Sequence, residues 1–259
     1  MALPSYFNSS LAKGLAILET IASNNASLTL TEIARSLDMD KSTTKRFLST
    51  LIDLGYVSVG QAGKTYAVSL QTLKLGYSAL SGLAWRDIAK VHLEKLYEEV
   101  QETVSASVLD NEHTLYIIRF AKPGFYVDGA VGFRRPAYFS SMGKMLLALV
   151  EPVSERKRLV ESIKMTPVTL FTHRTHEALL ADLEVTRRRG YAIANQEFSE
   201  FVRSIGVPIL FHSKPVAAFN IAVPVETYSV EQMVEILLPK MLACSRRISK
   251  ALDRIEYSL

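Results

Sequence analysis

The 259-residue chain has few of the residues that mark specialised classes of protein. A single cysteine, Cys244, excludes an intramolecular disulfide, and the apolar residues around it indicate a buried thiol in a reducing compartment. No apolar run approaches the roughly 18 residues needed to span a bilayer, and the first ten residues lack the basic and apolar segments of a signal peptide. We therefore expect a cytoplasmic protein with no membrane partner.

The chain also contains few prolines and has a small net charge. Nine prolines, 48% hydrophobic residues and no biased tract indicate ordinary globular material of about two domains. The net charge of +4 is uneven, because residues 1–86 hold 8 Lys or Arg against 5 Asp or Glu, whereas residues 87–259 hold 22 against 21. This weak basic excess is consistent with a DNA-binding domain joined to a nearly neutral one.

What the sequence does have is a helix-turn-helix pattern that begins at Thr29. Thr29 followed by Glu32 is a capping box, and the apolar stripe after it predicts a helix that runs to about Leu37. Residues 38–40 allow only a tight turn. Asp40 then suits the N-cap position of a second helix, so the spacing predicts two helices that meet at a sharp corner.

The second helix, which follows Asp40, has one apolar face and one polar face. Hydroxyls and cations occupy the polar face without a carboxylate, which suits hydrogen bonding to phosphates and base edges. Gly55 ends the helix, and strands at 56–59 and 65–68 around a glycine-containing turn predict a wing. The residues expected to contact double-stranded operator DNA are Lys41, Ser42, Thr43, Thr44, Lys45, Arg46, Ser49 and, beside the tip of the wing, Lys64.

A cationic helix face by itself is often only solvated surface. The order of helix, short turn, cationic helix, glycine stop and hairpin is much harder to reach by chance, so DNA binding is favoured. The alternative that this motif leaves open is a degenerate winged helix that contacts proteins, without DNA-linked sensing of a small molecule.

Several stretches resemble the IclR family of bacterial transcriptional regulators. SLAKGLAILETIA and KSTTKRFLSTLIDLGYV resemble its amino-terminal domain, and RRPAYFSSMGKMLLAL resembles the stretch that begins its effector pocket. GYAIANQEFSEFVRSIGVPI and VAAFNIAVP resemble the strands that complete that pocket. The resemblance runs from about Ser10 to the carboxyl terminus and implies a DNA-binding regulator with a GAF-like effector-binding domain.

The element pattern predicts four parts of the chain. Residues 1–9 show no periodicity and are expected to be a flexible arm, and residues 10–70 are expected to form the winged helix-turn-helix domain. Residues 71–86 predict a linker helix that either packs on its own winged helix or, as the resemblance favours, helps to make a homodimer or a dimer of dimers. Its apolar stripe consists of Leu73, Tyr77, Leu80 and Ala84.

Residues 87–259 are predicted to form an α+β effector-binding domain. An amphipathic helix precedes a hairpin whose strands are VSASVLD and TLYIIRF. Later strands are expected at 126–132, 191–194, 203–209 and 216–223, and helices at 143–149, 154–163, 176–189 and 230–255. Periodicity gives about six strands flanked by helices, and the resemblance implies that the sheet is antiparallel.

A pocket for a small organic acid is expected where polar groups converge on apolar walls. The turn before Gly143 offers hydroxyls and free helix N–H groups, which favour a carboxylate. Ser140 could equally be only an N-cap, and the resemblance favours the ligand. The residues expected to bind the effector are Arg134, Ser140, Ser141, Met142, Asn195, Glu197, Arg203, Ser204, Asn220 and Ala222.

The strands RSIGVP and FNIAVP differ from the serine-rich final strand and the cysteine or small residue found in many family members. They resemble the subgroup that controls degradation of aromatic acids, whose members answer to protocatechuate, hydroxybenzoate or β-ketoadipate. Arginine pairs with carboxylates in a bidentate manner, so an anionic aromatic or dicarboxylic acid is expected. The nearby side chains that favour it are Arg134, Arg135, Tyr138 and Arg203.

An enzyme that binds a small molecule is the rival class, and its usual motifs are missing. His173 and His176 have i, i+3 spacing but no nearby cysteine and no HExxH pattern, so surface or capping roles are favoured over metal binding. DGAVG lacks the third glycine of a dinucleotide loop, and Gly143-Lys144 follows no phosphate-loop glycine. Cys244 is favoured as a core residue rather than a nucleophile. We expect no catalytic residue, metal or cofactor.

Overall fold

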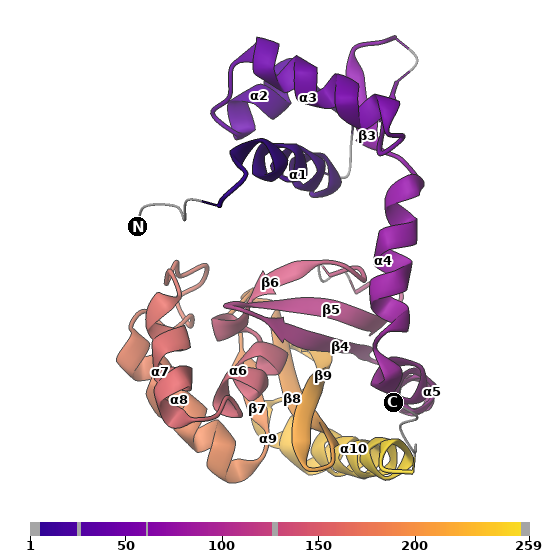
Figure 1. Ribbon diagram of the computed structural model, residues 1–259. Helices are drawn as coiled ribbons and strands as arrows, with labels where there is room; N and C mark the ends of the chain where they lie inside the picture. The colour runs from indigo at the N-terminus through magenta and orange to yellow at the C-terminus, as the bar shows by residue number, and fades with distance from the viewer. Residues whose placement is uncertain (1–5, 25–26, 61, 126–128, 255–259) are drawn as a thin grey trace. The chain divides into compact units, whose positions relative to one another are not determined.

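The computed structural model describes residues 6–24, 27–60, 62–125 and 129–254, and contacts divide the chain into two compact units (Figure 1). The N-terminal unit comprises Met1–Gly82 and the C-terminal unit Leu83–Leu259. Much of the expected arm lies outside the described residues. At its end, Asn8 caps the first helix, so the helix begins one residue before the expected domain boundary.

The N-terminal unit is a winged helix-turn-helix, as the sequence predicts. Its helices are α1 (Ser9–Ala22), α2 (Leu30–Ser36) and α3 (Lys41–Asp53), and its sheet has the order β1 (Leu28–Thr29), β3 (Thr65–Val68), β2 (Val57–Val59). The capping box of Thr29 and Glu32 is present with both hydrogen bonds. The core of the unit joins Ile17 of α1, Ile33 of α2 and Leu48 of α3, each at most 1% exposed.

The predicted linker region contains two helices rather than one. Helix α4 (Gln71–Ser81) has no buried residue, and Gly82 caps its carboxyl end. Ala84 begins the next helix, α5 (Ala84–Val100), so its expected place at the end of the linker stripe is wrong. The rest of the stripe remains on α4, where Leu73 and Tyr77 are largely exposed.

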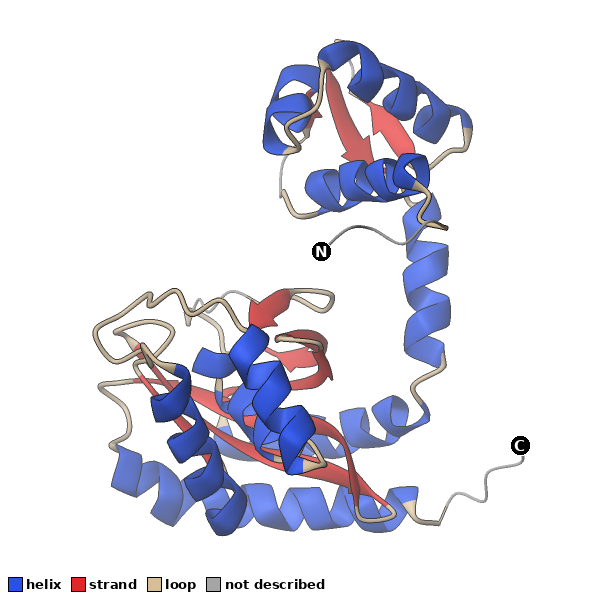
Figure 2. Ribbon diagram, turned by 60° about the vertical axis from the view of Figure 1, so that its left-hand side comes forward, coloured by secondary structure: helices blue, strands red, loops and turns tan. Residues whose placement is uncertain are grey.

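The C-terminal unit is built on a six-stranded antiparallel sheet, seen in Figure 2. The spatial order is β6 (Arg134–Pro136), β5 (His113–Phe120), β4 (Thr103–Asp110), β9 (Lys214–Pro224), β8 (Val202–Phe211), β7 (Ala192–Asn195). The strand expected at 126–132 is wrong over its described residues, which form a loop. Gly129 and Gly132 adopt positive φ angles there, and although Gly132 and Phe133 exchange backbone hydrogen bonds with Tyr116, the regular ladder with β5 begins at Arg134.

Helices cover both faces of this sheet (Figures 1 and 2). Helices α5 and α10 (Leu238–Leu252) pack together against one face, while α6 (Ser141–Ala148) packs on the other. Helices α7 (Val153–Ser162) and α8 (His176–Arg189) lie against α6. The expected helix at 230–255 is interrupted, because α9 (Val230–Gln232) and a π-helical turn (Met233–Leu237) precede α10.

Local sequence explains where α8 begins and ends. The side chain of Thr175 accepts a hydrogen bond from the Ala178 N–H, and three arginines in the last turn complement the helix dipole. Gly190 then takes a left-handed conformation that ends the helix. No helix in the described ranges is long and apolar enough to cross a membrane.

Candidate functional site

Helix α3 presents a cationic face to solvent. Lys45 and Arg46 are exposed, and so are most of the polar side chains predicted to contact DNA with them. Asp40 caps the helix by accepting a hydrogen bond from the Thr43 N–H at 2.7 Å. This hydrogen bond lowers the pKa of the Asp40 carboxyl. The exposed set comprises Lys41, Ser42, Lys45, Arg46, Ser49 and, on the wing, Lys64, while Thr43 is partly buried.

Thr44 is the exception among these predicted DNA contacts. Its side chain lies on the inner face of α3 and is fully buried. The hydroxyl donates to the carbonyl oxygen of Asp40 at 2.9 Å, which satisfies it within the protein. Thr44 therefore has a structural role at the start of the helix, and its expected contact with DNA is wrong.

A cavity lies in the C-terminal unit between the sheet and the amino end of α6. Its volume is about 30 Å³, enough to hold a water molecule. The lining combines hydroxyl and amide groups with aromatic rings and two guanidinium groups. The lining residues are Ser105, Tyr116, Arg119, Arg135, Phe139, Ser140, Ala194, Phe198, Val202, Ser204, Asn220 and Ala222.

Strand register brings the polar residues of this cavity together. Ser105 of β4 lies opposite Arg119 of β5 on one side and Asn220 of β9 on the other. The Arg119 Nη1 donates to the Ser105 Oγ at 3.2 Å. Ser204 of β8 lies opposite Ala222, two residues along β9 from Asn220, so both rows face the same side of the sheet.

One glycine lets α6 approach the sheet at this point, and another lets it approach the turn Ala137–Phe139. A Cβ on Gly206 of β8 would lie 2.8 Å from the backbone of Ser141, and a Cβ on Gly143 would lie 2.2 Å from the Ala137 carbonyl oxygen. Ser140 caps α6 and also lines the cavity. The close approach places Ser141 against the strands.

A short chain of hydrogen bonds connects α6 to the strands. The Ser141 Oγ donates to the Ser204 Oγ at 2.8 Å, and the Asn220 Nδ2 donates to the Ser141 Oγ at 3.5 Å. All three side chains are buried. The turn before α6 and the strands RSIGVP and FNIAVP therefore meet, as the sequence predicts.

Other predicted effector-binding residues lie outside the cavity lining. Arg134, whose side chain is half exposed, pairs with Asp110 at 2.9 Å. Met142 is fully buried, and its sulfur accepts a hydrogen bond from Ser107 at 3.4 Å.

Asn195 and Arg203 are also engaged elsewhere. Arg203 Nε donates to the Asn195 Oδ1 at 2.7 Å, and its Nη1 donates to the carbonyl oxygens of Val225 and Tyr228. These two side chains tie strands β7 and β8 to the segment after β9. Neither lines the cavity, and their expected contact with the effector stays a prediction.

The guanidinium group nearest to aromatic rings is that of Arg135, a residue noted from the sequence only as a nearby cation. Its Cζ lies 3.5 Å from the ring centroid of Phe198 and 5.9 Å from that of Tyr116. Arg135 is 3% exposed. Arg119, Ser105 and the aromatic residues were missed, because their approach depends on pairing between strands that no local motif records.

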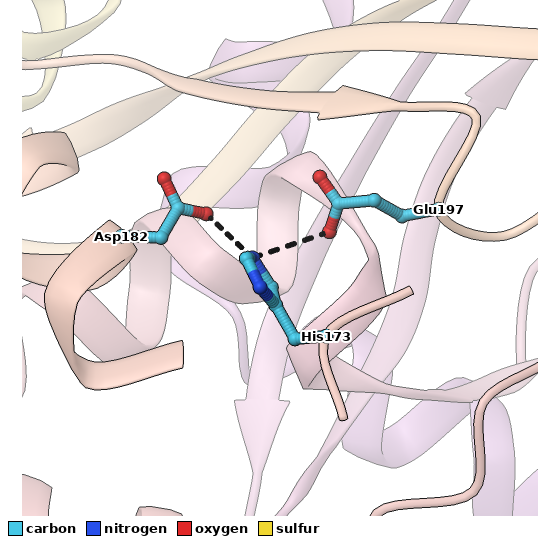
Figure 3. Close-up of side chains that lie close together, drawn as sticks. All are labelled: His173, Asp182 and Glu197. Carbon is cyan, nitrogen blue, oxygen red and sulfur yellow. Dashed lines mark hydrogen bonds and ion pairs between the residues drawn. The ribbon is translucent and has the colours of Figure 1, made fainter. Parts of the chain in front are cut away.

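Glu197 belongs to a separate ionic cluster beside α6. The ammonium group of Lys144, 1% exposed, contacts Asp182 at 2.7 Å and Glu197 at 2.6 Å. Figure 3 shows His173 between the same two carboxylates. The Nε2 of His173 lies 3.1 Å from the Oδ2 of Asp182. We call Lys144, His173, Asp182 and Glu197 the ionic cluster. It joins α6, α8 and the loop after β7.

The ionic cluster holds its own cation. His173, Asp182 and Glu197 have ligand atoms within 4.8 Å of one another, a spacing compatible with a metal ion. The Lys144 ammonium already lies between the carboxylates, so the chain supplies the positive charge that a metal would bring. The other histidine of the HRTH segment, His176, is separate from the cluster and contacts the Ile163 carbonyl oxygen at 2.9 Å.

Burial and charge act in opposite directions within the ionic cluster. Burial raises the pKa of Asp182, but hydrogen bonding to His173 and the charge of Lys144 outweigh it, so this pKa lies well below its usual value. At Glu197 burial is the stronger effect and raises the pKa. The two carboxylates therefore differ in how readily they take up a proton, and Glu197 depends more on Lys144 to remain charged.

A winged helix-turn-helix unit joined to a unit with a small polar cavity defines the class of ligand-responsive DNA-binding proteins. Two family models match the chain. The model of the IclR helix-turn-helix domain matches residues 10–59, and the model of the bacterial transcriptional regulator IclR C-terminal domain matches residues 77–250. The chain therefore belongs to the IclR family of bacterial transcriptional regulators, whose members are regulators and not enzymes.

Individual relatives agree with this assignment. The chain is 32% identical to the Pca regulon regulatory protein of Pseudomonas putida over 93% of its own length and 82% of the relative. It is 29% identical to the transcriptional regulator KdgR of Escherichia coli K12, over 96% and 94% of the two chains. The first of these likenesses supports the resemblance to the subgroup that controls degradation of aromatic acids.

Solved structures share the fold across almost the whole chain. The IclR homolog of Microbacterium hydrocarbonoxydans, complexed with 4-hydroxybenzoate, is 27% identical with a TM-score of 0.79, over 94% of this chain and 98% of the homolog. Thermotoga maritima IclR is 27% identical with a TM-score of 0.73, over 95% and 99% of the two chains.

Proposed function

We propose that this regulator binds operator DNA through the exposed face of α3 and changes its DNA affinity when a small aromatic or dicarboxylic acid occupies the cavity beside α6. The cavity lining is the observation that carries the choice of ligand. Arg119 and Arg135 are its charged lining residues, and none of the described residues that line it is acidic. Guanidinium groups bind carboxylates well, so an organic anion fits this lining.

Aromatic side chains and two relatives support an aromatic acid. Tyr116, Phe139 and Phe198 supply flat apolar walls suited to a ring. The Microbacterium homolog was solved with 4-hydroxybenzoate, and the Pseudomonas relative regulates the Pca regulon. These likenesses favour an aromatic acid over a sugar acid as the effector.

The cavity is small, so the side chains that form its walls must move when the effector binds. A volume of about 30 Å³ is too small for a benzoate-sized ligand, so binding requires side chains to move. Phe198 is partly exposed and lies in the loop after β7, whereas Ser204 and Asn220 lie within strands. We expect Phe198 to move away from Arg135 and expose the guanidinium group to the acid.

Homodimerisation through α4 is the second part of the proposal. Leu73 and Tyr77 are one helical turn apart, and their exposed fractions are 64% and 69%. A helix-turn-helix protein needs two recognition helices for two half-sites, which a dimer provides. Substitution of Leu73 by Glu is expected to give monomers in sedimentation velocity and to weaken operator binding. Unchanged dimerisation would contradict this role of α4.

Calorimetry tests the ligand class directly. Titration with protocatechuate, 4-hydroxybenzoate and β-ketoadipate is expected to give saturable heat with at least one of them. An Arg135→Met variant should lose most of that affinity, whereas Arg134→Met, which removes a residue outside the cavity lining, should retain it. If no acid binds wild-type protein, the proposed effector class is wrong.

A further inference from the structure

Asn220 carries a polar atom that the protein leaves without a partner. The residue lines the cavity and is 6% exposed. Its Oδ1 is buried and has no hydrogen-bond partner among the described residues. A buried acceptor without a donor costs about 1–3 kcal/mol, so a ligand that donates a hydrogen bond to this cavity-lining oxygen would be stabilised.

The surrounding hydrogen bonds fix which way the Asn220 amide points. A serine hydroxyl has one proton to donate, and that of Ser141 goes to the Ser204 Oγ at 2.8 Å. The Ser141 Oγ can then act only as an acceptor, so it faces the Asn220 NH₂ group rather than the carbonyl oxygen. The opposite orientation would leave two acceptors facing each other.

Neighbouring residues do not supply the missing donor. Ser105 is the cross-strand partner of Asn220, and its Oγ accepts a hydrogen bond from the Arg119 Nη1 at 3.2 Å but makes none to the Asn220 Oδ1. Gly206, the partner on the other side, has no side chain. The Asn220 Oδ1 is therefore free to accept a hydrogen bond from a molecule that enters the cavity.

We propose that the Asn220 Oδ1 accepts a hydrogen bond from a hydroxyl group of the effector, and that Asn220 thereby selects hydroxylated aromatic acids over acids that lack the hydroxyl. This inference rests on the proposed function of the cavity. A cationic donor is disfavoured because Arg119 and Arg135 line the same cavity. A neutral hydroxyl provides the donor without adding positive charge.

The discrimination follows from the energetics of an unmatched polar group. A site built to bind a ligand hydroxyl rejects the analogue that lacks it, because the protein acceptor then stays buried and unpaired. Replacement of Asn220 by Leu removes the acceptor at similar volume. The variant should therefore lose affinity for the hydroxylated acid and bind the plain acid equally well or better.

The test compares hydroxylated and plain acids on matched variants by calorimetry. The ligands are benzoate, 3-hydroxybenzoate, 4-hydroxybenzoate and protocatechuate. Wild-type protein should bind at least one hydroxylated acid at least about tenfold more tightly than benzoate. In Asn220→Leu this ratio should fall to about threefold or less, while Arg134→Met, which alters a residue outside the cavity lining, should keep it. Asn220→Ser serves as a second variant if the leucine disturbs folding, which circular dichroism checks.

The outcomes separate this inference from the proposed function. If wild-type protein binds aromatic acids without a preference for a hydroxyl, or if the preference survives in both Asn220 variants, the role of Asn220 is wrong and the cavity remains an acid site. If wild-type protein binds none of the aromatic acids, the aromatic effector and this inference fail together. The same holds if β-ketoadipate is the only acid that binds.

Discussion

Replacement of Lys144 by Met should destabilise the C-terminal unit strongly. Methionine preserves the length of the lysine side chain but removes the ammonium group that lies 2.7 Å from Asp182 and 2.6 Å from Glu197. The side chains of these two carboxylates are 21% and 8% exposed. The substitution therefore leaves two nearby carboxylates with His173 as the nearest remaining source of positive charge in the ionic cluster.

The expected loss in the free energy of unfolding is about 3–5 kcal/mol, the range measured when one partner of a buried ion pair is removed. Most of this cost is that of uncompensated buried charge, not the net value of the ion pair. A triple variant that also carries Asp182→Asn and Glu197→Gln should therefore recover much of the lost stability.

Urea unfolding followed by tryptophan fluorescence measures the effect, because Trp85 is the only tryptophan and lies buried in α5 of the C-terminal unit. Lys157→Met provides a control on α7, where the lysine side chain is 64% exposed. This control should change stability by no more than about 0.5 kcal/mol. A loss below about 1 kcal/mol in Lys144→Met would refute the reasoning.

The pH dependence distinguishes charge from packing. In the wild type the pKa of Asp182 is lowered, so its stabilising contribution is present at neutral pH and is lost as the pH falls below the ordinary aspartate value of 3.8. In Lys144→Met both carboxylates should take up protons more readily, which relieves their repulsion in acid. The stability difference between the two proteins should therefore narrow as the pH is lowered from 7 toward 4. A constant difference would indicate lost packing instead.

Three further predictions concern other parts of the chain. Gly206→Ala should lower the free energy of unfolding by about 1–3 kcal/mol and weaken acid binding, because the added Cβ would force α6 away from the sheet. As a control, a Cβ at Gly76 on α4 meets no atom within 4 Å, so Gly76→Ala should not destabilise the protein. Burial raises the pKa of the Cys244 thiol to about 11. At pH 8 the native protein should therefore react with a disulfide reagent more than about 100-fold more slowly than the unfolded protein. Equal rates would place the thiol at the surface. Arg46→Ala should reduce the slope of log affinity for DNA against log salt by about 0.9, and Lys157→Ala should leave the slope unchanged. An unchanged slope in Arg46→Ala would remove that residue from the DNA contacts.

Features that depend on neighbouring residues were predictable from the sequence. The capping box of Thr29 and Glu32 and the cap at Asp40 join residues three positions apart, so the winged helix could be placed closely. The helix 176–189 was also predicted with its observed bounds, because Thr175 and Gly190 are strong local signals for its ends.

The cavity was predictable only in part, because it depends on contacts between distant segments. The Ser141–Ser204 hydrogen bond spans 63 positions, and only the family resemblance brought these residues together. Arg119 enters the cavity through the register of β4 and β5, which no motif records. Glu197 lies past the end of β7, so strand alternation no longer sets its direction, and Lys144 draws it away from the cavity.

The most direct test of the account measures the coupling between DNA and acid on the same protein. DNA selected in vitro by wild-type protein, and not by Arg46→Ala, supplies the operator duplex. Affinity for this duplex is then measured with and without a saturating aromatic acid. Because the coupling between two sites typically lies between 1 and 3 kcal/mol, the acid should change DNA affinity by about 5- to 150-fold. Selection of no preferred sequence, or equal affinity with and without an acid that binds, would contradict the account.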